Sequence, residues 1–174
     1  KDIQAPKVIS SSFIKGDNSY IIQFDFDEQI QIHNWEESFY ISPPLDNKVQ
    51  KKVQARSLII NIEDTLCNES TYSICLNSCI KDNNEGNLLT KYFYNFSLNE
   101  SLDTFSLSGS LKDAYTLDSM EGAAILLYDI NIVDSLIFQI LPNYIAKTDK
   151  NGQFNFSNFD SKAYNVFAHK DFNY

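Results

Sequence analysis

The feature that most constrains this chain is a two-residue alternation of apolar and polar side chains. Residues 20–26 read YIIQFDF, with an aromatic or aliphatic residue at every even position. Successive side chains of a β-strand point to opposite faces, so such a segment buries one face and exposes the other. A helical period appears only briefly, at Trp35–Ser38. No apolar run approaches the roughly 20 residues that a membrane helix needs. The alternation predicts an all-β fold of antiparallel strands.

The alternating segments fall into two series, separated by the short polar stretch around Asn99. Clusters of Asn, Asp, Gly and Pro between the segments supply turns. A chain of 174 residues accommodates two sandwich modules of roughly 75–100 residues each. We therefore expect two consecutive antiparallel β-sandwich domains, at residues 1–99 and 100–174. The segments are residues 20–26, 30–33, 58–63, 72–77, 92–96, 105–111, 125–128, 153–156 and 164–168.

The three cysteines are Cys67, Cys75 and Cys79. An odd number cannot be fully paired within one chain, and the spacing fits no zinc site. We interpret them as unpaired thiols, with a Cys67–Cys79 disulfide as the alternative. The alternation in residues 72–77 places Ser73 and Cys75 on the polar face of their strand.

The composition argues against several function classes. Lys and Arg total 14 and Asp and Glu total 23, so the formal charge is 14 − 23 = −9. A surface of this sign repels nucleic acid and anionic membranes. The two histidines, His33 and His169, fall in different predicted domains, and five glycines leave little for a phosphate loop. No serine lies in a Gly-x-Ser-x-Gly turn. The sequence predicts no enzyme, no catalytic residue and no cofactor.

The first half resembles the bacterial Ig-like domain of S-layer proteins and surface lipoproteins. The order and spacing of several short stretches over nearly a hundred residues carry the resemblance. They are Ala5–Ser10, Phe26–Ile30, Ile41–Leu45, Ser70–Ile74, Ile80–Asn87 and Tyr94–Ser97.

The second half looks like a transthyretin-like (prealbumin-like) or carboxypeptidase-regulatory-like sandwich. The family usually has a glycine shortly before the tyrosine that corresponds to Tyr164, whereas this chain reads Asp160–Ala163, so this turn must be built differently. We expect a closing strand of this domain to lie beyond Tyr174. The matching stretches are Leu107–Ala114, Gly122–Tyr128, Thr148–Phe159 and Tyr164–Ala168.

The two modules in this order resemble the N-terminal part of Bacteroidota surface lipoproteins. The resemblance implies export, a lipid anchor upstream of this segment, and an outer-membrane-anchored location in the periplasm or at the cell surface. It implies a non-catalytic structural or interaction module, whose partner is another surface protein or a glycan. The alternative is a carbohydrate- or protein-binding adhesion module with a defined ligand.

Aromatic side chains could supply a stacking platform for a sugar. Trp35 lies in an acidic polar stretch and Tyr40 follows shortly after it. These two residues are the candidate ligand-binding residues. The competing interpretation places them in the hydrophobic core, as for most aromatic residues of a sandwich.

The segment Asp82–Asn87 carries oxygen donors of the kind that Ca²⁺ accepts. Asp82, Asn84 and Glu85 are the candidate ligands. The segment lacks the EF-hand spacing, and Asn and Gly also build ordinary hairpin turns. Calcium is the one cofactor that we keep as an alternative to none.

Three tripeptides resemble the short O-glycosylation signal of exported proteins in that phylum. They begin at Asp64, Asp118 and Asp134, and their acceptor hydroxyls belong to Thr65, Ser119 and Ser135. The resemblance implies glycosylation at these residues, although tripeptides this short also arise by chance.

Overall fold

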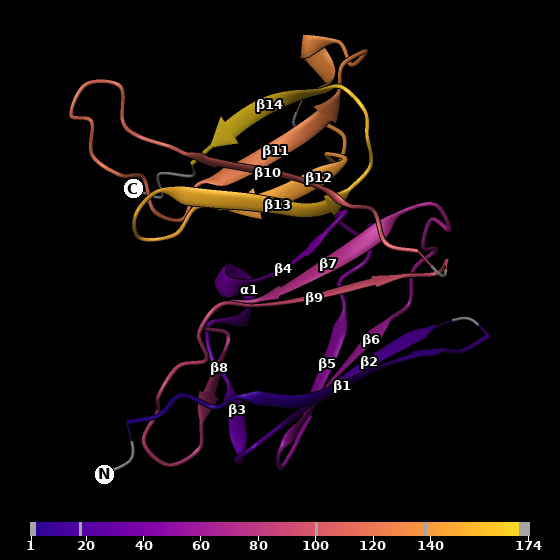
Figure 1. The fold of residues 1–174 in the computed structure, drawn as a ribbon, viewed down its shortest axis with the longest axis vertical. Coiled ribbons are helices and arrows are strands. Elements are labelled where there is room, and N and C mark those ends of the chain that lie inside the picture. The colour runs from indigo at the N-terminus through magenta and orange to yellow at the C-terminus, as the bar shows by residue number, and fades with distance from the viewer. Residues whose placement is uncertain (1–2, 18, 100, 138, 171–174) are drawn as a thin grey trace. The chain divides into compact units, whose positions relative to one another are not determined.

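The computed structural model describes residues 3–17, 19–99, 101–137 and 139–170. Antiparallel strands dominate this part of the chain, and α1 (Trp35–Ser38) is a single helical turn (Figure 1). The all-β prediction is confirmed. The chain divides into two compact units. Unit 1 comprises Lys1–Phe39, Leu45–Leu66 and Ile74–Tyr94, and unit 2 comprises Tyr40–Pro44, Cys67–Ser73 and Asn95–Tyr174.

Unit 1 is built on a four-stranded sheet of order β1-β2-β6-β5, and all its pairs are antiparallel. A shorter pair joins β3 to β8. The bounds are β1 Val8–Lys15, β2 Tyr20–Phe26, β3 Ile30–Ile32, β5 Gln50–Gln54, β6 Ser57–Ile62 and β8 Ile80–Asp82.

The core of unit 1 follows directly from the alternation. Phe24 pairs with Leu58 across β2 and β6, and all the even-numbered residues from Ile22 to Phe26 are fully buried. The Phe24 ring meets Tyr92 and Tyr94 edge-on, with centroids 6.0 and 5.2 Å apart. A second layer therefore covers the apolar face of this sheet.

A three-stranded sheet of order β4-β7-β9 contributes residues to both units. Its strands are β4 Phe39–Ser42, β7 Thr71–Leu76 and β9 Tyr92–Ser97. All six residues of the central strand β7 are buried, and Cys75 has no exposed surface. The expectation that Ser73 and Cys75 face solvent is wrong. Side chains this small fit a layer that is covered on both faces.

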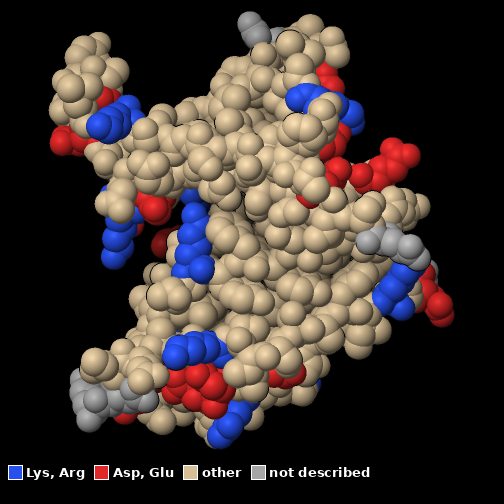
Figure 2. Space-filling view, in the orientation of Figure 1, with Lys and Arg blue, Asp and Glu red and all other residues tan. Residues whose placement is uncertain are grey.

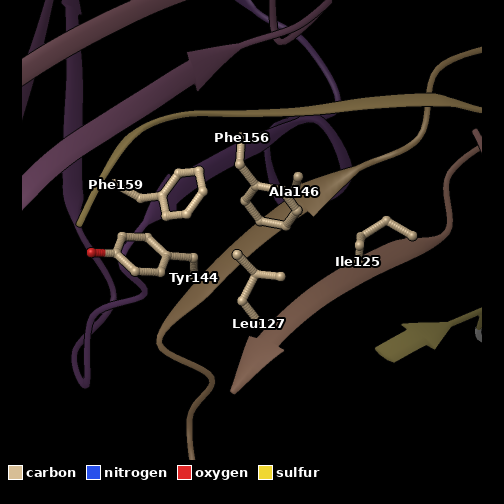
Figure 3. Packing of buried hydrophobic residues seen from close by; sticks show 6 residues of the cluster. All are labelled: Ile125, Leu127, Tyr144, Ala146, Phe156 and Phe159. Atoms are coloured by element: carbon tan, nitrogen blue, oxygen red, sulfur yellow. The ribbon is translucent and has the colours of Figure 1, made fainter. Parts of the chain in front are cut away.

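Unit 2 is a sandwich of a two-stranded sheet, β10-β13, and a three-stranded sheet of order β12-β11-β14. Figure 3 shows its core, where side chains of β11, β12 and β13 meet between the sheets: Ile125, Leu127, Tyr144, Ala146, Phe156 and Phe159. The bounds are β10 Phe105–Ser110, β11 Ala124–Asp129, β12 Tyr144–Lys147, β13 Gln153–Phe159 and β14 Tyr164–His169, with a short 3₁₀ turn, η1, at Asp134–Leu136.

Strand β10 departs from the burial that its alternation predicts. Leu107 pairs with the buried Phe156 and shares its face, yet Phe105 and Leu107 are 52% and 36% exposed. The physical reason is position: β10 is hydrogen-bonded to β13 on one side, and no described strand pairs with its other edge. Gly109 in the same strand lies under Phe154, where an added Cβ would come within 2.5 Å of Cζ.

We expect Leu127→Ala to lower the free energy of unfolding by about 2–5 kcal/mol, because it opens a cavity in the core of unit 2. Val166→Ala, at a residue 52% exposed, is the matched control and should cost less than about 1 kcal/mol. Urea unfolding followed by circular dichroism measures both. Equal losses in the two variants would contradict this assignment of the core.

Candidate functional site

The best-defined polar site of unit 1 is the loop that follows β8. Asp82 is 1% exposed, and its carboxylate accepts hydrogen bonds from four backbone N–H groups of the loop. Oδ1 accepts from Asn84, Glu85 and Gly86 at 2.9, 2.6 and 2.9 Å. Oδ2 accepts from Asn87 at 2.8 Å, and the Asp82 N–H donates to the Asn87 carbonyl at 3.1 Å. A single side chain thus holds the whole loop.

These contacts fix the charge of Asp82. Burial raises the pKa of its carboxyl, but the backbone N–H groups favour the ionised form and lower the pKa to about 2 overall. Gly86 adopts a positive φ of 82°, which allows its N–H to point at the carboxylate.

The predicted calcium ligands Asp82, Asn84 and Glu85 do share this loop. However, both Asp82 oxygens point at backbone donors of the loop, which a cation would have to displace. Within the described ranges, no three His, Cys, Asp or Glu side chains are grouped as a metal ion would require. Calcium binding here stays a prediction.

Trp35 is buried at the start of α1, with 7% of its surface exposed. Its ring stacks on Phe39 with centroids 4.1 Å apart and planes 13° apart. The Lys51 ammonium lies 5.0 Å from the ring centroid and 3.2 Å from Glu36. Contacts of this kind leave no open aromatic face at Trp35. Tyr40 is half-buried in β4. Sugar binding by these two residues stays a prediction.

The three candidate glycosylation residues are all exposed. Thr65 lies between β6 and β7, and Ser135 lies in η1. Ser119 forms an isolated antiparallel bridge with Lys112. Their hydroxyls are therefore accessible to a modifying enzyme, and their modification stays a prediction.

Unit 2 contains a polar network that no sequence pattern predicts. The Thr71 N–H donates to Asp103 Oδ2 at 3.2 Å, and the Asp103 N–H donates back to Thr71 Oγ1 at 2.7 Å. Asn158 Nδ2 donates to the Asp103 carbonyl at 2.7 Å, and Asn95 Nδ2 donates to Asn158 Oδ1 at 2.8 Å. Asn158 has a φ of 58°, a conformation that asparagine tolerates better than most residues. The network fastens segments that are far apart in the chain.

A second cluster of polar side chains holds the turn between β13 and β14. The Tyr144 and Tyr164 hydroxyls both donate to Asp160 Oδ1, the former at 3.4 Å. Lys162 Nζ lies 2.6 Å from Asp160 Oδ2. One carboxylate between β13 and β14 therefore holds two tyrosine hydroxyls and a lysine ammonium together.

The pKa shifts in this cluster indicate a structural role for its side chains rather than a catalytic one. Burial raises the pKa of Tyr144 to about 12 and also raises that of Tyr164, whose hydroxyl is further held by Asp160. For Asp160, burial opposes ionisation, but hydrogen bonds from Lys162 and Tyr164 lower its pKa overall. Both tyrosines therefore stay protonated and Asp160 stays ionised at neutral pH.

The remaining reactive groups are dispersed. His33 lies in unit 1 after β3, and His169 ends β14 in unit 2. All three cysteines are thiols: Cys75 and Cys79 are buried and Cys67 is exposed. Burial and the neighbouring Cys75 raise the pKa of Cys79 to about 12, so its thiol is not a nucleophile at neutral pH.

In the comparison with protein families, the model of the bacterial Ig-like domain matches residues 2–98. Comparison with curated proteins and with solved structures gave no significant match. Among the described residues, the helical segments are all too short or too polar to cross a membrane.

We expect Asp82→Asn to destabilise the protein near neutral pH. The folded pKa of about 2 lies below the ordinary value of 3.8, so the stabilisation is complete above about pH 5 and is lost as pH falls through the folded pKa. Urea midpoints of the wild type and Asp82→Asn should therefore converge between pH 5 and pH 2. Asp17→Asn, at an exposed turn residue, is the control and should show no such convergence.

Calcium chloride should leave the melting temperature of the wild type unchanged, because the Asp82 oxygens already have donors. A rise in melting temperature that is absent in Asp82→Asn would instead establish the loop as a calcium site.

Trp35→Ala should lower the free energy of unfolding by about 3–5 kcal/mol, since it removes a buried ring that contacts Phe39 and Lys51. Lys48→Ala, at a side chain 93% exposed beside Glu36, is the control and should be nearly neutral. Urea unfolding followed by circular dichroism measures both. A glycan array that lost binding in a Trp35→Ala variant of unchanged stability would support the sugar platform instead.

Proposed function

The chain belongs to the bacterial Ig-like domain family through residues 2–98, and on this premise we propose that it is a non-catalytic structural and interaction module of an exported, membrane-anchored surface lipoprotein. The observation that carries the proposal is the family match itself, which spans the strands from β1 to β9. Domains of this family are typically non-enzymatic surface or structural modules of bacterial proteins.

The hydrogen bonds and pKa shifts of the polar side chains support a structural role for the chain. The carboxylates of Asp82 and Asp160 accept hydrogen bonds that hold a loop and a turn. The tyrosines with the largest pKa shifts, Tyr144 and Tyr164, face Asp160 and remain protonated at neutral pH. An enzyme places groups with shifted pKa values around a cleft where substrate can reach them. In this chain the groups with shifted pKa values, Tyr144 and Tyr164, instead hold Asp160 in the turn between β13 and β14.

For the second half we propose a transthyretin-like sandwich, with the domain boundary near residue 99. Support comes from the two facing sheets of unit 2 and from the family match, which ends at residue 98. With this boundary, the segments Tyr40–Pro44 and Cys67–Ser73 belong to the first domain. The division into compact units instead groups both segments with unit 2.

We further propose that a lipid anchor upstream of Lys1 tethers the protein to the outer membrane, on the periplasmic side or at the cell surface. A partner there is another surface protein or a glycan. The net charge of −9 suits a water-exposed module that stays clear of anionic lipid headgroups. The exposed hydroxyls of Thr65, Ser119 and Ser135 are the proposed O-glycosylation acceptors.

The test uses the full-length protein in its own bacterium. Metabolic labelling with an alkyne fatty acid should label the protein, and replacement of the lipidated cysteine by alanine should abolish the label and release the protein from the membrane fraction. Intact mass of the exported form should exceed the polypeptide mass by glycan units, and T65V, S119A and S135A together should remove the excess. Recovery of the unlabelled protein in the cytoplasmic fraction would contradict the proposal.

A further inference from the structure

The division into compact units does not follow the end of the family match. The match covers residues 2–98, yet unit 2 includes three segments from within it: Tyr40–Pro44, Cys67–Ser73 and residues 95–98. These segments contain one end of each of the strands β4, β7 and β9, and the other ends of the same strands belong to unit 1. Each strand of the hydrogen-bonded sheet β4-β7-β9 therefore passes from one unit to the other within its length.

The ends of β7 and β9 in unit 2 are hydrogen-bonded to residues beyond the family match. In β7, Thr71 exchanges two hydrogen bonds with Asp103, at 3.2 and 2.7 Å. In β9, Asn95 Nδ2 donates to Asn158 Oδ1 at 2.8 Å. Asn158 Nδ2 donates in turn to the Asp103 carbonyl at 2.7 Å, so the two contacts form one connected set. We call these four residues the Asp103 network.

The segments that the family domain contributes to unit 2 are also buried. In β4, the buried Ser42 accepts a hydrogen bond at Oγ from the Ile145 N–H at 3.0 Å. Thr71 is buried as well, and the buried rings of Tyr72 and Phe96 stack with centroids 5.5 Å apart. Buried polar groups need their hydrogen-bond partners. The folded ends of β4 and β7 therefore depend on residues that follow the family match.

The ion pairs of the described residues do not provide a comparable link. Glu36 pairs with Lys48 and Lys51 inside unit 1, and Lys162 pairs with Asp160 inside one turn of unit 2. Figure 2 shows the charged side chains of the visible face scattered in small groups rather than gathered in one patch. The Asp103 network is therefore the polar contact that ties the family strands to the rest of unit 2.

We propose that the Asp103 network couples the stabilities of the two units, so that the chain unfolds in one cooperative transition. Unfolding of unit 2 removes the partners of Thr71 and Asn95, and the loss reaches unit 1 because β7 and β9 continue there. Coupling of this kind is reciprocal, so destabilisation of unit 1 lowers the stability of unit 2 as well. The proposal goes beyond the surface role proposed above and does not depend on export or on a lipid anchor.

Trp35 makes the coupling measurable in the 174-residue chain. It is the single tryptophan and lies buried in unit 1, so its fluorescence reports on unit 1, while amide hydrogen exchange in β11 and β13 reports on unit 2. Leu127→Ala, in the core of unit 2, should lower the urea midpoint of Trp35 fluorescence by about 1 M. Leu58→Ala, in the core of unit 1, should accelerate exchange in β11 and β13. Ile125→Val, in the same cluster as Leu127, replaces Leu127→Ala if that variant does not fold.

The Asp103 network is tested by combining Asp103→Ala with Asn158→Gly. Glycine suits the φ of 58° at position 158, so the change removes the side-chain contact without straining the backbone. In this background, the shift that Leu127→Ala causes in the Trp35 midpoint should fall to about half or less, because the two units then unfold more independently. Thr71→Val, which removes a single hydroxyl, takes the place of the double change if that protein does not fold.

Asn155→Ala is the matched control. Its side chain accepts a hydrogen bond from Ser108 Oγ at 2.8 Å between β10 and β13, within unit 2, and its loss should leave the Leu127→Ala shift at full size. The proposal is overturned if Leu127→Ala accelerates exchange in β11 and β13 but leaves the Trp35 midpoint unchanged, since the units would then unfold independently. An equal shift in the control and in the variants of the Asp103 network would also overturn it, because the coupling would not pass through these residues.

Discussion

Pairing of inward-facing apolar residues across antiparallel strands is the interaction on which both units depend. In unit 1, Phe24 lies opposite Leu58, and the edges of Tyr92 and Tyr94 cover the Phe24 ring from a second layer. In unit 2, Leu127 and Phe156 lie in facing sheets and meet in one cluster. Each such residue needs two things: a neighbour in its own sheet and a cover from the opposite sheet. Where either is missing, the apolar side chain remains exposed to solvent.

This dependence explains which elements the sequence predicts well. In β2 and β6 the alternation matches the observed burial, because each strand has a partner on both sides and one covered face. In β7 the alternation fails, since both faces are covered and even Ser73 is buried. In β10 it fails in the opposite direction, since the strand lies at an edge. Periodicity is a property of one strand, whereas burial is set by neighbours that the local sequence does not specify.

The candidate sites show the same contrast between what the local sequence predicts and what neighbouring elements decide. Composition alone indicates that Asp82–Asn87 is a turn with many oxygen atoms, but not whether they point outward to a cation or inward to the backbone. The missing glycine before Tyr164 signals an unusual turn, but not that Asp160 holds it through two tyrosines. Trp35 in an acidic stretch suggests an exposed ring, yet Phe39 and Lys51 cover it. Residue type predicts the interaction that a side chain can make, and the fold selects its partner.

A polar side chain can serve either a binding site or the framework around it. Side-chain sites require convergent groups, whereas the buried carboxylate of Asp82 and the half-buried carboxylate of Asp160 hold a loop and a turn.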